Sequence, residues 1–272
     1  MPALNGAWIE ESRPLPKYEL SQTRVIVACI LKKKAERTVV EPEDLKQTIK
    51  VCMFDQYGTV VDMQTGLTEI ATPYLKAKGW TGNPYSFVTW WRRTHFENSM
   101  IDALFNKEHT PYREIGHRSV AFVLERGGIP YTMAEVHALV AEIEKLRCFP
   151  EVPEALARLQ TRYKLVVLSN GDPDMLETAK KYHCIPFDRV ISVAEANSFK
   201  PHVATYTKAA ELLGLRMEEV LFVANHAFDC IGAKSAGMRT AFIDRRRLPF
   251  GQTPHQPDII APTMKDLADV MV

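Results

Sequence analysis

The chain has 272 residues, enough to bury a full core in one domain with an insertion or in two modest domains. Its 46% hydrophobic and 25% charged residues are typical of a soluble globular protein, which excludes wholesale disorder and a fibrous repeat. The 34 basic and 33 acidic residues give a net charge of +1, so no global field draws the protein to nucleic acid or to an anionic membrane.

The five cysteines are scattered, odd in number and without CxxC spacing, which argues against a disulfide framework and a zinc site. No apolar run approaches the roughly 18 residues of a membrane span, and the N-terminus lacks the pattern of a signal peptide. We therefore expect a soluble protein of the reducing cytoplasm. The short basic runs at 32–34 and 245–247 are expected to be solvated surface without function.

Residues 1–48 mix prolines and charges with one apolar run at 25–31, and we interpret them as an N-terminal arm of unknown role. The continuous apolar run at 51–54 then ends in Asp-Gln-Tyr-Gly-Thr, as expected of a buried parallel strand that leads into a turn. Residues 64–147 show helical periodicity only, which predicts an inserted, all-helical cap domain.

From residue 148 the chain alternates between helical and strand patterns. Helices are predicted at 153–159, 174–182, 203–213 and 228–236, and strands at 165–168, 190–193, 220–223 and 240–243. Such alternation predicts an α/β fold with a doubly wound, mainly parallel sheet, whose ligands bind at the carboxyl ends of the strands. Residues 49–63 and 148–272 are assigned to this core domain.

Polar clusters follow four of the predicted strands, at the edge where ligands are expected. They are Asp55-Gln56-Tyr57-Gly58-Thr59, Ser169-Asn170-Gly171, Lys200-Pro201 and Asn225-His226-Ala227-Phe228-Asp229. A carboxylate that faces a lysine and hydroxyl groups is held ionised, because charge pairing and hydrogen bonds to the charged form both lower its pKa. Since an ionised carboxylate can attack carbon or phosphorus, Asp55 is the candidate nucleophile.

The order of these clusters resembles the haloacid dehalogenase superfamily, which includes many phosphatases. The residues that carry the resemblance are Asp55 to Thr59, Ser169, Lys200-Pro201 and Asp229, and it covers residues 49–272. The segments 54–59, 168–171 and 199–201 and the pair Trp91-Arg92 are similar to the L-2-haloacid dehalogenase branch. The resemblance implies a Rossmann-like core with a helical cap, and a homodimer is expected.

Two positions separate this branch from the phosphatases. A phosphatase needs an acid two residues after the nucleophile to protonate the leaving alkoxide, whereas halide leaves as an anion, and here that position is Tyr57. Phosphatases of the superfamily also hold Mg²⁺ with an acidic residue about where Asn225 stands, and an amide adds no charge to such a site. We therefore expect neither a metal nor a cofactor.

The resemblance implies hydrolytic dehalogenation of short (S)-2-haloalkanoic acids to (R)-2-hydroxy acids, with the 2-haloacid and water as the small-molecule partners. Asp55 attacks C2 in line and forms an ester that water cleaves. Thr59, Ser169 and Lys200 hold and polarise the Asp55 carboxyl, and Arg92 binds the leaving halide. Further candidates for contact with the halide or substrate are Asn170, Tyr57 and Tyr206.

The pair Asn225-His226 is the main departure from the family pattern, which has two serines and an asparagine before the equivalent of Asp229. A histidine with a pKa near neutrality is suited to act as general base for the hydrolytic water, and Asp229 or Glu69 would orient it. Whether His226 or Asp229 activates the water stays open.

Two other functions stay open as well. One is a hydrolase that uses the same nucleophile on another carbon electrophile bearing a carboxylate, such as a strained cyclic amino acid. The other is a catalytically silent binding protein on the same scaffold, because a fold alone never proves activity. Retention of both Asp55 and Lys200 argues against the silent protein, and a phosphatase is disfavoured by Tyr57 and Asn225.

Overall fold

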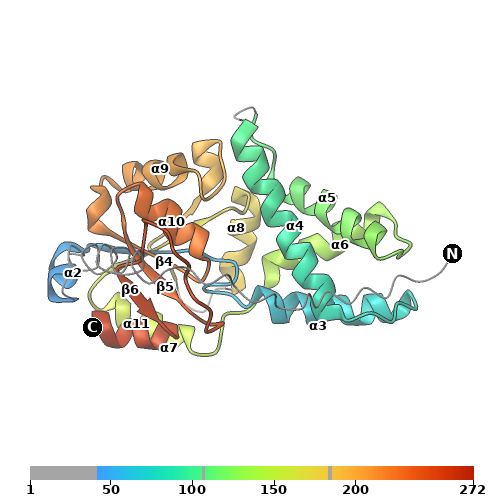
Figure 1. Ribbon diagram of the computed structural model, residues 1–272, viewed down its shortest axis with the longest axis horizontal. Helices are drawn as coiled ribbons and strands as arrows, with labels where there is room; N and C mark the ends of the chain where they lie inside the picture. The colour runs from blue at the N-terminus through green and yellow to red at the C-terminus, as the bar shows by residue number, and fades with distance from the viewer. Residues whose placement is uncertain (1–41, 106–107, 183–185) are drawn as a thin grey trace, which may run out of the picture. The chain divides into compact units, whose positions relative to one another are not determined.

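A parallel β-sheet forms the centre of the described structure (Figure 1). The computed structural model describes residues 42–105, 108–182 and 186–272, and within them the sheet has six strands in the order β3-β2-β1-β4-β5-β6. The strands are β1 (Val51–Phe54), β2 (Lys164–Ser169), β3 (Arg189–Ser192), β4 (Val220–Ala224), β5 (Arg239–Ile243) and β6 (Ile259–Ala261). Every pairing is parallel, so the carboxyl ends share one edge. The predicted α/β fold is confirmed, although β6 was not predicted.

Helices cover both faces of this sheet. Those that follow its strands are α7 (Val152–Gln160), α8 (Pro173–Ala179), α9 (Val203–Leu213), α10 (Ala227–Ser235) and α11 (Met264–Met271). Short 3-10 helices are η2 (Lys180–Tyr182), η3 (Val193–Ala196) and η4 (Met217–Glu219). In Figure 1, α9 and α10 lie on one face, and α7 and α11 lie on the other. The central strands β1 and β4 are therefore buried on both sides, which is why they consist of continuous apolar runs.

The segment before β1 is a helix rather than part of an arm. This helix, α2 (Pro42–Thr48), lies against α11, and its Leu45 side chain is buried in the main core. The compact unit that contains the sheet begins at Val40. The predicted end of the N-terminal arm at residue 48 is therefore too late, because this helix shares its core with a helix from the other end of the chain. The apolar run at 25–31 lies outside the described residues.

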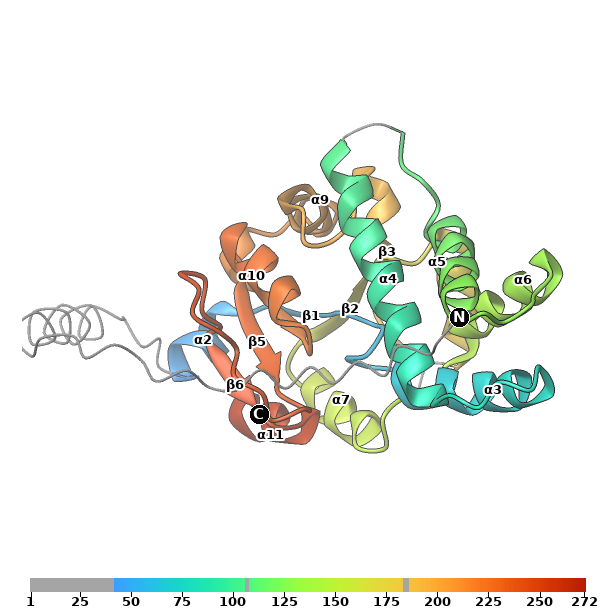
Figure 2. The ribbon, with the colours of Figure 1, turned by 45° about the vertical axis from the view of Figure 1, so that its right-hand side comes forward.

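A group of helices stands between β1 and α7 in the chain and lies to one side of the sheet (Figure 2). It comprises α3 (Met63–Ala77), α4 (Pro84–Phe105), α5 (Tyr112–Arg126), α6 (Met133–Ala141) and the 3-10 helix η1 (Glu142–Lys145). The longest, α4, packs against both α3 and α5. The predicted helical insertion is thus present. Its boundaries as a cap of residues 64–147 stay a prediction, since the sheet and these helices belong to one compact unit.

A carboxylate from the sheet side fixes the start of α5. Asp172, which follows β2, accepts hydrogen bonds from the backbone N–H groups of Tyr112 at 2.7 Å and Arg113 at 3.0 Å. The first N–H groups of a helix have no partner within the helix, and a negative charge is favourable there. Nη1 of Arg113 also pairs with Asp174 at 2.9 Å. Tyr112 is thereby held against the carboxyl edge of the sheet.

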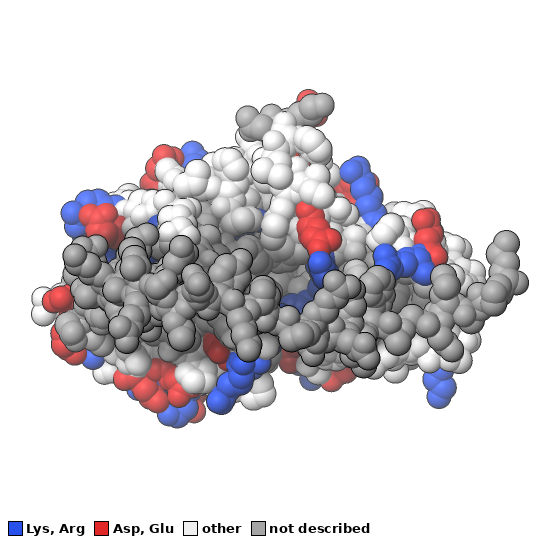
Figure 3. All heavy atoms as spheres, viewed as in Figure 1, with Lys and Arg blue, Asp and Glu red and all other residues white. Residues whose placement is uncertain are grey.

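The visible surface carries both signs of charge in close mixture. In Figure 3, Lys and Arg atoms lie beside Asp and Glu atoms over much of the described part of the face. Exposed pairs one helical turn apart, such as Arg93–Glu97 and Lys265–Asp269, contribute to this pattern. It is the distribution expected from a net charge of +1. None of the described helices is long and apolar enough to cross a membrane.

The described cysteines differ in state. Cys52 and Cys230 are free and buried, and burial raises the pKa of both thiols, so neither is a ready nucleophile. Cys148 is disulfide-bonded, which the cysteine spacing did not predict.

Candidate active site

Asp55 lies at the carboxyl end of β1 with only 6% of its surface exposed. Its Oδ1 accepts a hydrogen bond from Nζ of Lys200 at 2.6 Å, and its Oδ2 accepts one from Oγ1 of Thr59 at 2.7 Å. The Asp55 backbone N–H donates to the carbonyl of Val223 in the neighbouring strand β4 at 3.0 Å. Both the position of Asp55 and the orientation of its carboxylate are thus fixed.

The turn after Asp55 requires glycine at position 58. Gly58 has a φ of 92°, in the region that residues with a side chain rarely adopt. A Cβ at this position would lie 3.0 Å from Cε1 of His226 and 3.2 Å from Nη2 of Arg92. The turn therefore brings the backbone next to Asp55 close to a histidine from β4 and an arginine from α4.

Lys200 joins two carboxylates. Its Nζ donates to Oδ1 of Asp55 at 2.6 Å, to Oδ2 of Asp229 at 2.9 Å and to the carbonyl of Leu168 at 3.1 Å. These contacts use all three donors of the ammonium. Burial lowers the pKa of Lys200, but the two carboxylates outweigh burial and raise the pKa above its ordinary value. Lys200 is therefore a permanent positive charge beneath the nucleophile.

The pKa values of the two carboxylates shift in opposite directions. Burial raises the pKa of Asp55, but Lys200 and the nearby His226 outweigh it and hold the pKa well below the usual range. For Asp229 burial is decisive, and Lys200 offsets it only in part, so its pKa is raised. Asp55 is thus ionised at neutral pH, as a carboxylate nucleophile must be.

Tyr206 supports Asp229 and lines neither cavity at the site. Its side chain is fully buried, and its hydroxyl donates to Oδ1 of Asp229 and, at 3.2 Å, to the Asp229 carbonyl. The predicted contact between Tyr206 and the substrate is not observed, because α9 directs this side chain into the core. We call Asp55, Thr59, Lys200, Tyr206 and Asp229 the charge network.

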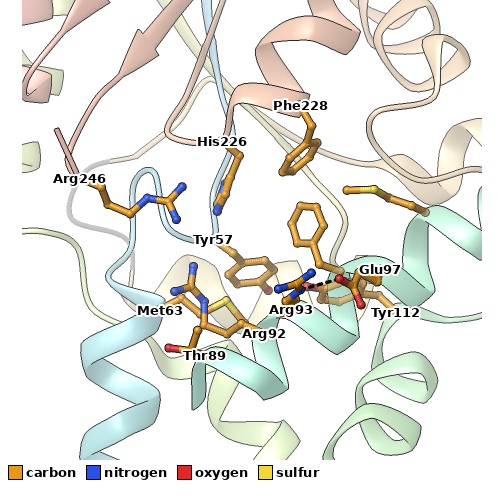
Figure 4. A pocket seen from close by; sticks show the side chains of 12 residues that line it. Tyr57, Met63, Thr89, Arg92, Arg93, Glu97, Tyr112, His226, Phe228 and Arg246 are labelled. Carbon is orange, nitrogen blue, oxygen red and sulfur yellow. Dashed lines mark hydrogen bonds and ion pairs between the residues drawn. The ribbon is translucent and has the colours of Figure 1, made fainter. Parts of the chain in front are cut away.

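A cavity of about 350 Å³, the main cavity, lies between the strand ends and the helical insertion (Figure 4). Asp55 is not among its lining residues, but His226, whose Nδ1 lies 3.6 Å from Oδ2 of Asp55, is. Its wall comes from the loops after β1, β4 and β5, the start of α3, and helices α4 and α5. The apolar and aromatic side chains are Tyr57, Met63, Phe96, Met100, Tyr112 and Phe228. The polar and charged ones are Thr89, Arg92, Arg93, Glu97, His226 and Arg246.

A second cavity of about 330 Å³, the side cavity, adjoins the main one. The two share Thr89, Arg92, His226 and Arg246 in their walls. The side cavity is also lined by Gly58, the glycine of the nucleophile turn. The approach to Asp55 is therefore surrounded by cationic side chains from two different parts of the fold.

Arg92 points into both cavities from α4. Trp91, its neighbour, is fully buried and anchors the helix, while Nη1 of Arg92 donates to Oε1 of Gln64 at 2.8 Å. Burial lowers the pKa of Arg92, and the positive charge of Arg246 lowers it further. The adjacent Arg93 is an exposed side chain that pairs with Glu97 at 2.6 Å. Arg92 is therefore the arginine of this pair that is suited to an anion.

His226 stands at the end of β4 and lines both cavities. Its Nδ1 lies 3.6 Å from Oδ2 of Asp55 and has no hydrogen-bond partner among the residues that the structure describes. The ring packs against Phe96 and Phe228, with centroid distances of 5.5 Å and 5.4 Å. Aromatic packing, rather than a bond to Asp229 or Glu69, therefore positions His226.

Glu69 does not reach the site. On α3 the buried side chains are Met63, Leu67, Ala71 and Leu75, which repeat every fourth residue and face the core. Glu69 follows Leu67 by two positions, which places it on the opposite, exposed side of the helix. The prediction that Glu69 orients His226 is thus contradicted by the phase of α3.

Two predicted residues at the end of β2 take part in local bonds. Oγ of Ser169 accepts a hydrogen bond from the N–H of Gly171 at 3.2 Å and makes none with Asp55. Oδ1 of Asn170 accepts one from the backbone N–H of Lys200 at 3.1 Å. These bonds shape the loops that carry the charge network, and neither residue lines the cavities.

Asn225 lines the side cavity, and Tyr57 lines the main cavity. The Asn225 backbone N–H donates to Oγ1 of Thr59, and its Nδ2 donates to the carbonyl of Gly58, both at 2.9 Å. Tyr57 lines the main cavity and stacks on Tyr112, with ring centroids 6.1 Å apart. Burial raises the pKa of the Tyr57 hydroxyl well above its ordinary value, so it is a weak proton donor.

Two arginines after β5 belong to the site, although the sequence analysis gave the run at 245–247 no function. Arg245 pairs with Glu151, donates to the carbonyl of Thr59 at 3.0 Å and lies 3.8 Å from the ring centroid of Phe149. Arg246 lines both cavities. The sequence did offer one indication, because residues 245–247 directly follow a predicted strand, and the carboxyl end of a parallel strand lies at the edge of the sheet where ligands bind.

The residues of the site do not form a typical cation site. Among the described residues, no group of three or more His, Cys, Asp or Glu side chains is placed to hold a metal ion. The position between the carboxylates of Asp55 and Asp229 is occupied by the ammonium of Lys200. What the arrangement offers chemically is an ionised carboxylate beside a cavity that favours anions.

Comparisons with known proteins agree with this chemistry. A model of haloacid dehalogenase-like hydrolases matches residues 49–237. The (S)-2-haloacid dehalogenase of Xanthobacter autotrophicus is 32% identical over 201 residues, which cover 72% of this chain and 76% of that protein. Haloacetate dehalogenase H-2 of Moraxella sp. (strain B) is 26% identical over 219 residues, or 79% and 95% of the two chains. A structure of L-2-haloacid dehalogenase from Xanthobacter autotrophicus with chloropropionic acid covalently bound gives a TM-score of 0.71 at 28% identity and covers 82% and 98%.

Proposed function

The chain belongs to the haloacid dehalogenase-like hydrolase family, and on this premise we propose that it converts short (S)-2-haloalkanoic acids to (R)-2-hydroxy acids. One observation carries the proposal. The Asp55 carboxylate is held ionised by Lys200 and Thr59, and its Oδ2 lies 3.6 Å from Nδ1 of His226, a residue that lines the main cavity together with Arg92. The relatives named (S)-2-haloacid dehalogenase support the same reaction.

In the first step, a carboxylate oxygen of Asp55 attacks C2 of the substrate from the side opposite the halogen. The new C–O bond forms while the carbon–halogen bond breaks, and halide departs with the bonding electron pair. Carbon C2 is inverted, and Asp55 carries an ester. The halide leaves into the guanidinium of Arg92, whose charge stabilises the anion as it develops.

In the second step, water attacks the Asp55 carbonyl carbon and breaks the bond between that carbon and the ester oxygen. The ester oxygen leaves as the hydroxyl of the product, and the oxygen of the water stays in the Asp55 carboxylate. The (R)-2-hydroxy acid leaves, and the Asp55 carboxylate is restored. Nδ1 of His226 has no hydrogen-bond partner in the described part of the chain and lies 3.6 Å from Oδ2 of Asp55, which suits it to take the proton of that water. Asp229 is already bonded to Lys200 and Tyr206, which favours His226 as the base.

The composition of the cavity favours carbon–halogen chemistry over phosphoryl transfer. A phosphate ester needs a proton for its leaving alkoxide, and the residue two positions after the nucleophile is Tyr57, whose raised pKa makes it a weak acid. A halide needs no proton. A cavity of about 350 Å³ with apolar walls suits a short alkanoate.

Incubation with L-2-chloropropionate tests the proposal. Equal amounts of chloride and D-lactate are expected, and repeated turnover in ¹⁸O-labelled water should place the label in the Asp55 carboxylate. No chloride release, together with hydrolysis of p-nitrophenyl phosphate, would overturn it. No chloride release together with opening of 1-aminocyclopropane-1-carboxylate would favour the hydrolase of a strained cyclic amino acid instead.

We also propose that the enzyme is a cytoplasmic homodimer. The exposed apolar side chains Ile101, Leu104 and Phe105 at the end of α4 support association of two copies. Light scattering of the purified protein measures its mass, and a monomer at micromolar concentration would rule out the dimer.

A further inference from the structure

The arginines around the cavities are not equally engaged. Arg245 is bound to Glu151 and to the backbone of Thr59, so it serves the structure of the loop. Arg93 is paired with Glu97. By contrast, Arg246 makes no hydrogen bond or ion pair with any residue that the structure describes, although it lines both cavities.

Arg246 also lies close to His226 and Arg92. In Figure 4 its side chain extends from the loop after β5 toward the space between His226 and Arg92. Its positive charge is close enough to lower the pKa of the Arg92 guanidinium. Two cations that face one shared space repel each other, and anions bound between them remove that repulsion.

A 2-haloacid presents two anionic groups during its reaction, the carboxylate and the departing halide. We propose that Arg246 binds the carboxylate of the substrate while Arg92 receives the halide. This inference rests on the proposed function and extends it, because it assigns one arginine to each anion. It also makes Arg246 the residue that selects 2-haloacids over uncharged organohalogen compounds, which have no carboxylate.

The direction of attack supports this division. The leaving group must lie opposite the attacking oxygen of Asp55, and hence on the side of the helical insertion, where α4 supplies Arg92. The carboxylate stands to one side of that line. Arg246 comes from the sheet edge, in the loop after β5, and reaches the cavity from such a lateral position.

The bonding capacity of the two guanidinium groups supports it as well. Nη1 of Arg92 already donates one hydrogen bond to Gln64, so this guanidinium is partly engaged within the protein. Arg246 retains its whole planar fork. Such a fork matches the two oxygens of a carboxylate with two parallel hydrogen bonds.

The test measures the binding of two unreactive anions. One is propionate, which has a carboxylate but no halogen, and the other is bromide. Isothermal titration calorimetry at constant ionic strength compares wild type with Arg246→Gln, Arg92→Gln and Arg247→Gln. Arg246→Gln should weaken propionate binding about 10- to 100-fold and leave bromide nearly unchanged, whereas Arg92→Gln should do the reverse. Arg247→Gln is the matched control, since it removes a positive charge from the same loop at a residue that lines neither cavity.

Unchanged propionate binding in Arg246→Gln would overturn the assignment, and so would equal weakening of both anions or the same loss in Arg247→Gln. In kinetics, Arg246→Gln should raise KM for L-2-chloropropionate more than it lowers kcat. The binding measurement needs no turnover. A protein that binds propionate through Arg246 and releases no chloride would therefore refute the proposed function alone.

Discussion

The charge network below β1 and the wall of the main cavity differ in how their polar atoms are paired. In the network, Asp55, Lys200 and Asp229 are bonded to one another. In the wall, the hydroxyl of Tyr57 and Nε of Arg92 are buried, and neither has a hydrogen-bond partner among the described residues. Buried polar groups are normally paired, so an unpaired one calls for an explanation. The reacting group, Asp55, is therefore held rigidly by its hydrogen bonds, whereas the groups in the wall keep free hydrogen-bonding capacity for a ligand.

Replacement of Asp55 tests the network side most severely. Asp55→Asn keeps the shape of the side chain but removes the nucleophile, and kcat for chloride release should fall by about 10⁴-fold or more. Circular dichroism should show an unchanged fold, because Thr59 can still donate to the amide oxygen. Activity close to that of the wild type would place the nucleophile elsewhere.

Replacement of His226 tests the wall. His226→Ala should leave the first step intact and slow ester hydrolysis by about 10²- to 10⁴-fold, so that the Asp55 ester accumulates. Rapid quench followed by mass spectrometry of the intact protein measures the adduct. His137→Ala, at an exposed position on α6, is the control and should show no accumulation. Absence of the adduct in His226→Ala would show that a residue other than His226 activates the hydrolytic water.

Replacement of Lys200 should show how much the stability of the fold depends on the charge network. Lys200→Met leaves two buried carboxylates that face each other, and the free energy of unfolding in urea should fall by about 3–5 kcal/mol. Lys180→Met removes an exposed pair with Glu177 and should cost less than about 1 kcal/mol. Similar losses in the two variants would contradict the buried network.

Lys200→Met should also reverse the way in which Asp55 makes the free energy of unfolding depend on pH. In wild type the folded pKa of Asp55 lies below the ordinary value of 3.8, so its stabilisation is complete above that pH and is lost as pH falls through the folded pKa. Without Lys200, burial raises the folded pKa, and acidification should restore part of the lost stability. Urea unfolding at neutral and mildly acidic pH measures this reversal.

Two tyrosine hydroxyl groups, those of Tyr206 and Tyr74, give the smallest and most selective comparison. Tyr206→Phe removes a donor from the buried Asp229 and should cost about 1–3 kcal/mol. Tyr74→Phe removes a hydroxyl whose buried oxygen has no hydrogen-bond partner in residues 42–105, 108–182 and 186–272, and it should be nearly neutral. Thermal unfolding of both variants ranks them, and equal effects would show that the bond to Asp229 contributes little.

The sequence predicted those parts of the site that depend on local pattern and on the geometry of parallel sheets. Asp55, Lys200 and Asp229 follow strands whose carboxyl ends share one edge, so their meeting follows from the order of the elements. The same reasoning predicted the sheet and the helical insertion. β6 escaped it, because three residues are too few to show a period.

The failures concern direction and tertiary partners. Whether Glu69 reaches the site depends on the phase of α3, which only the packed helix reveals. Arg246 stands in a run of like charges that is indistinguishable from solvated surface until β5 is placed in the sheet. Tyr206 has the composition of a cavity residue, but its helix faces the core.

The hydrogen bonds of Asp172 limit how the cavity can open. The carboxylate holds the N-terminus of α5, and Tyr112 at that point stacks on Tyr57 beside the nucleophile. Sliding α5 away from the sheet breaks both bonds and separates the stacked rings, whereas a swing about Asp172 preserves them. Asp172 therefore ties the first turn of α5, and with it the tyrosine pair in the wall of the main cavity, to the end of β2.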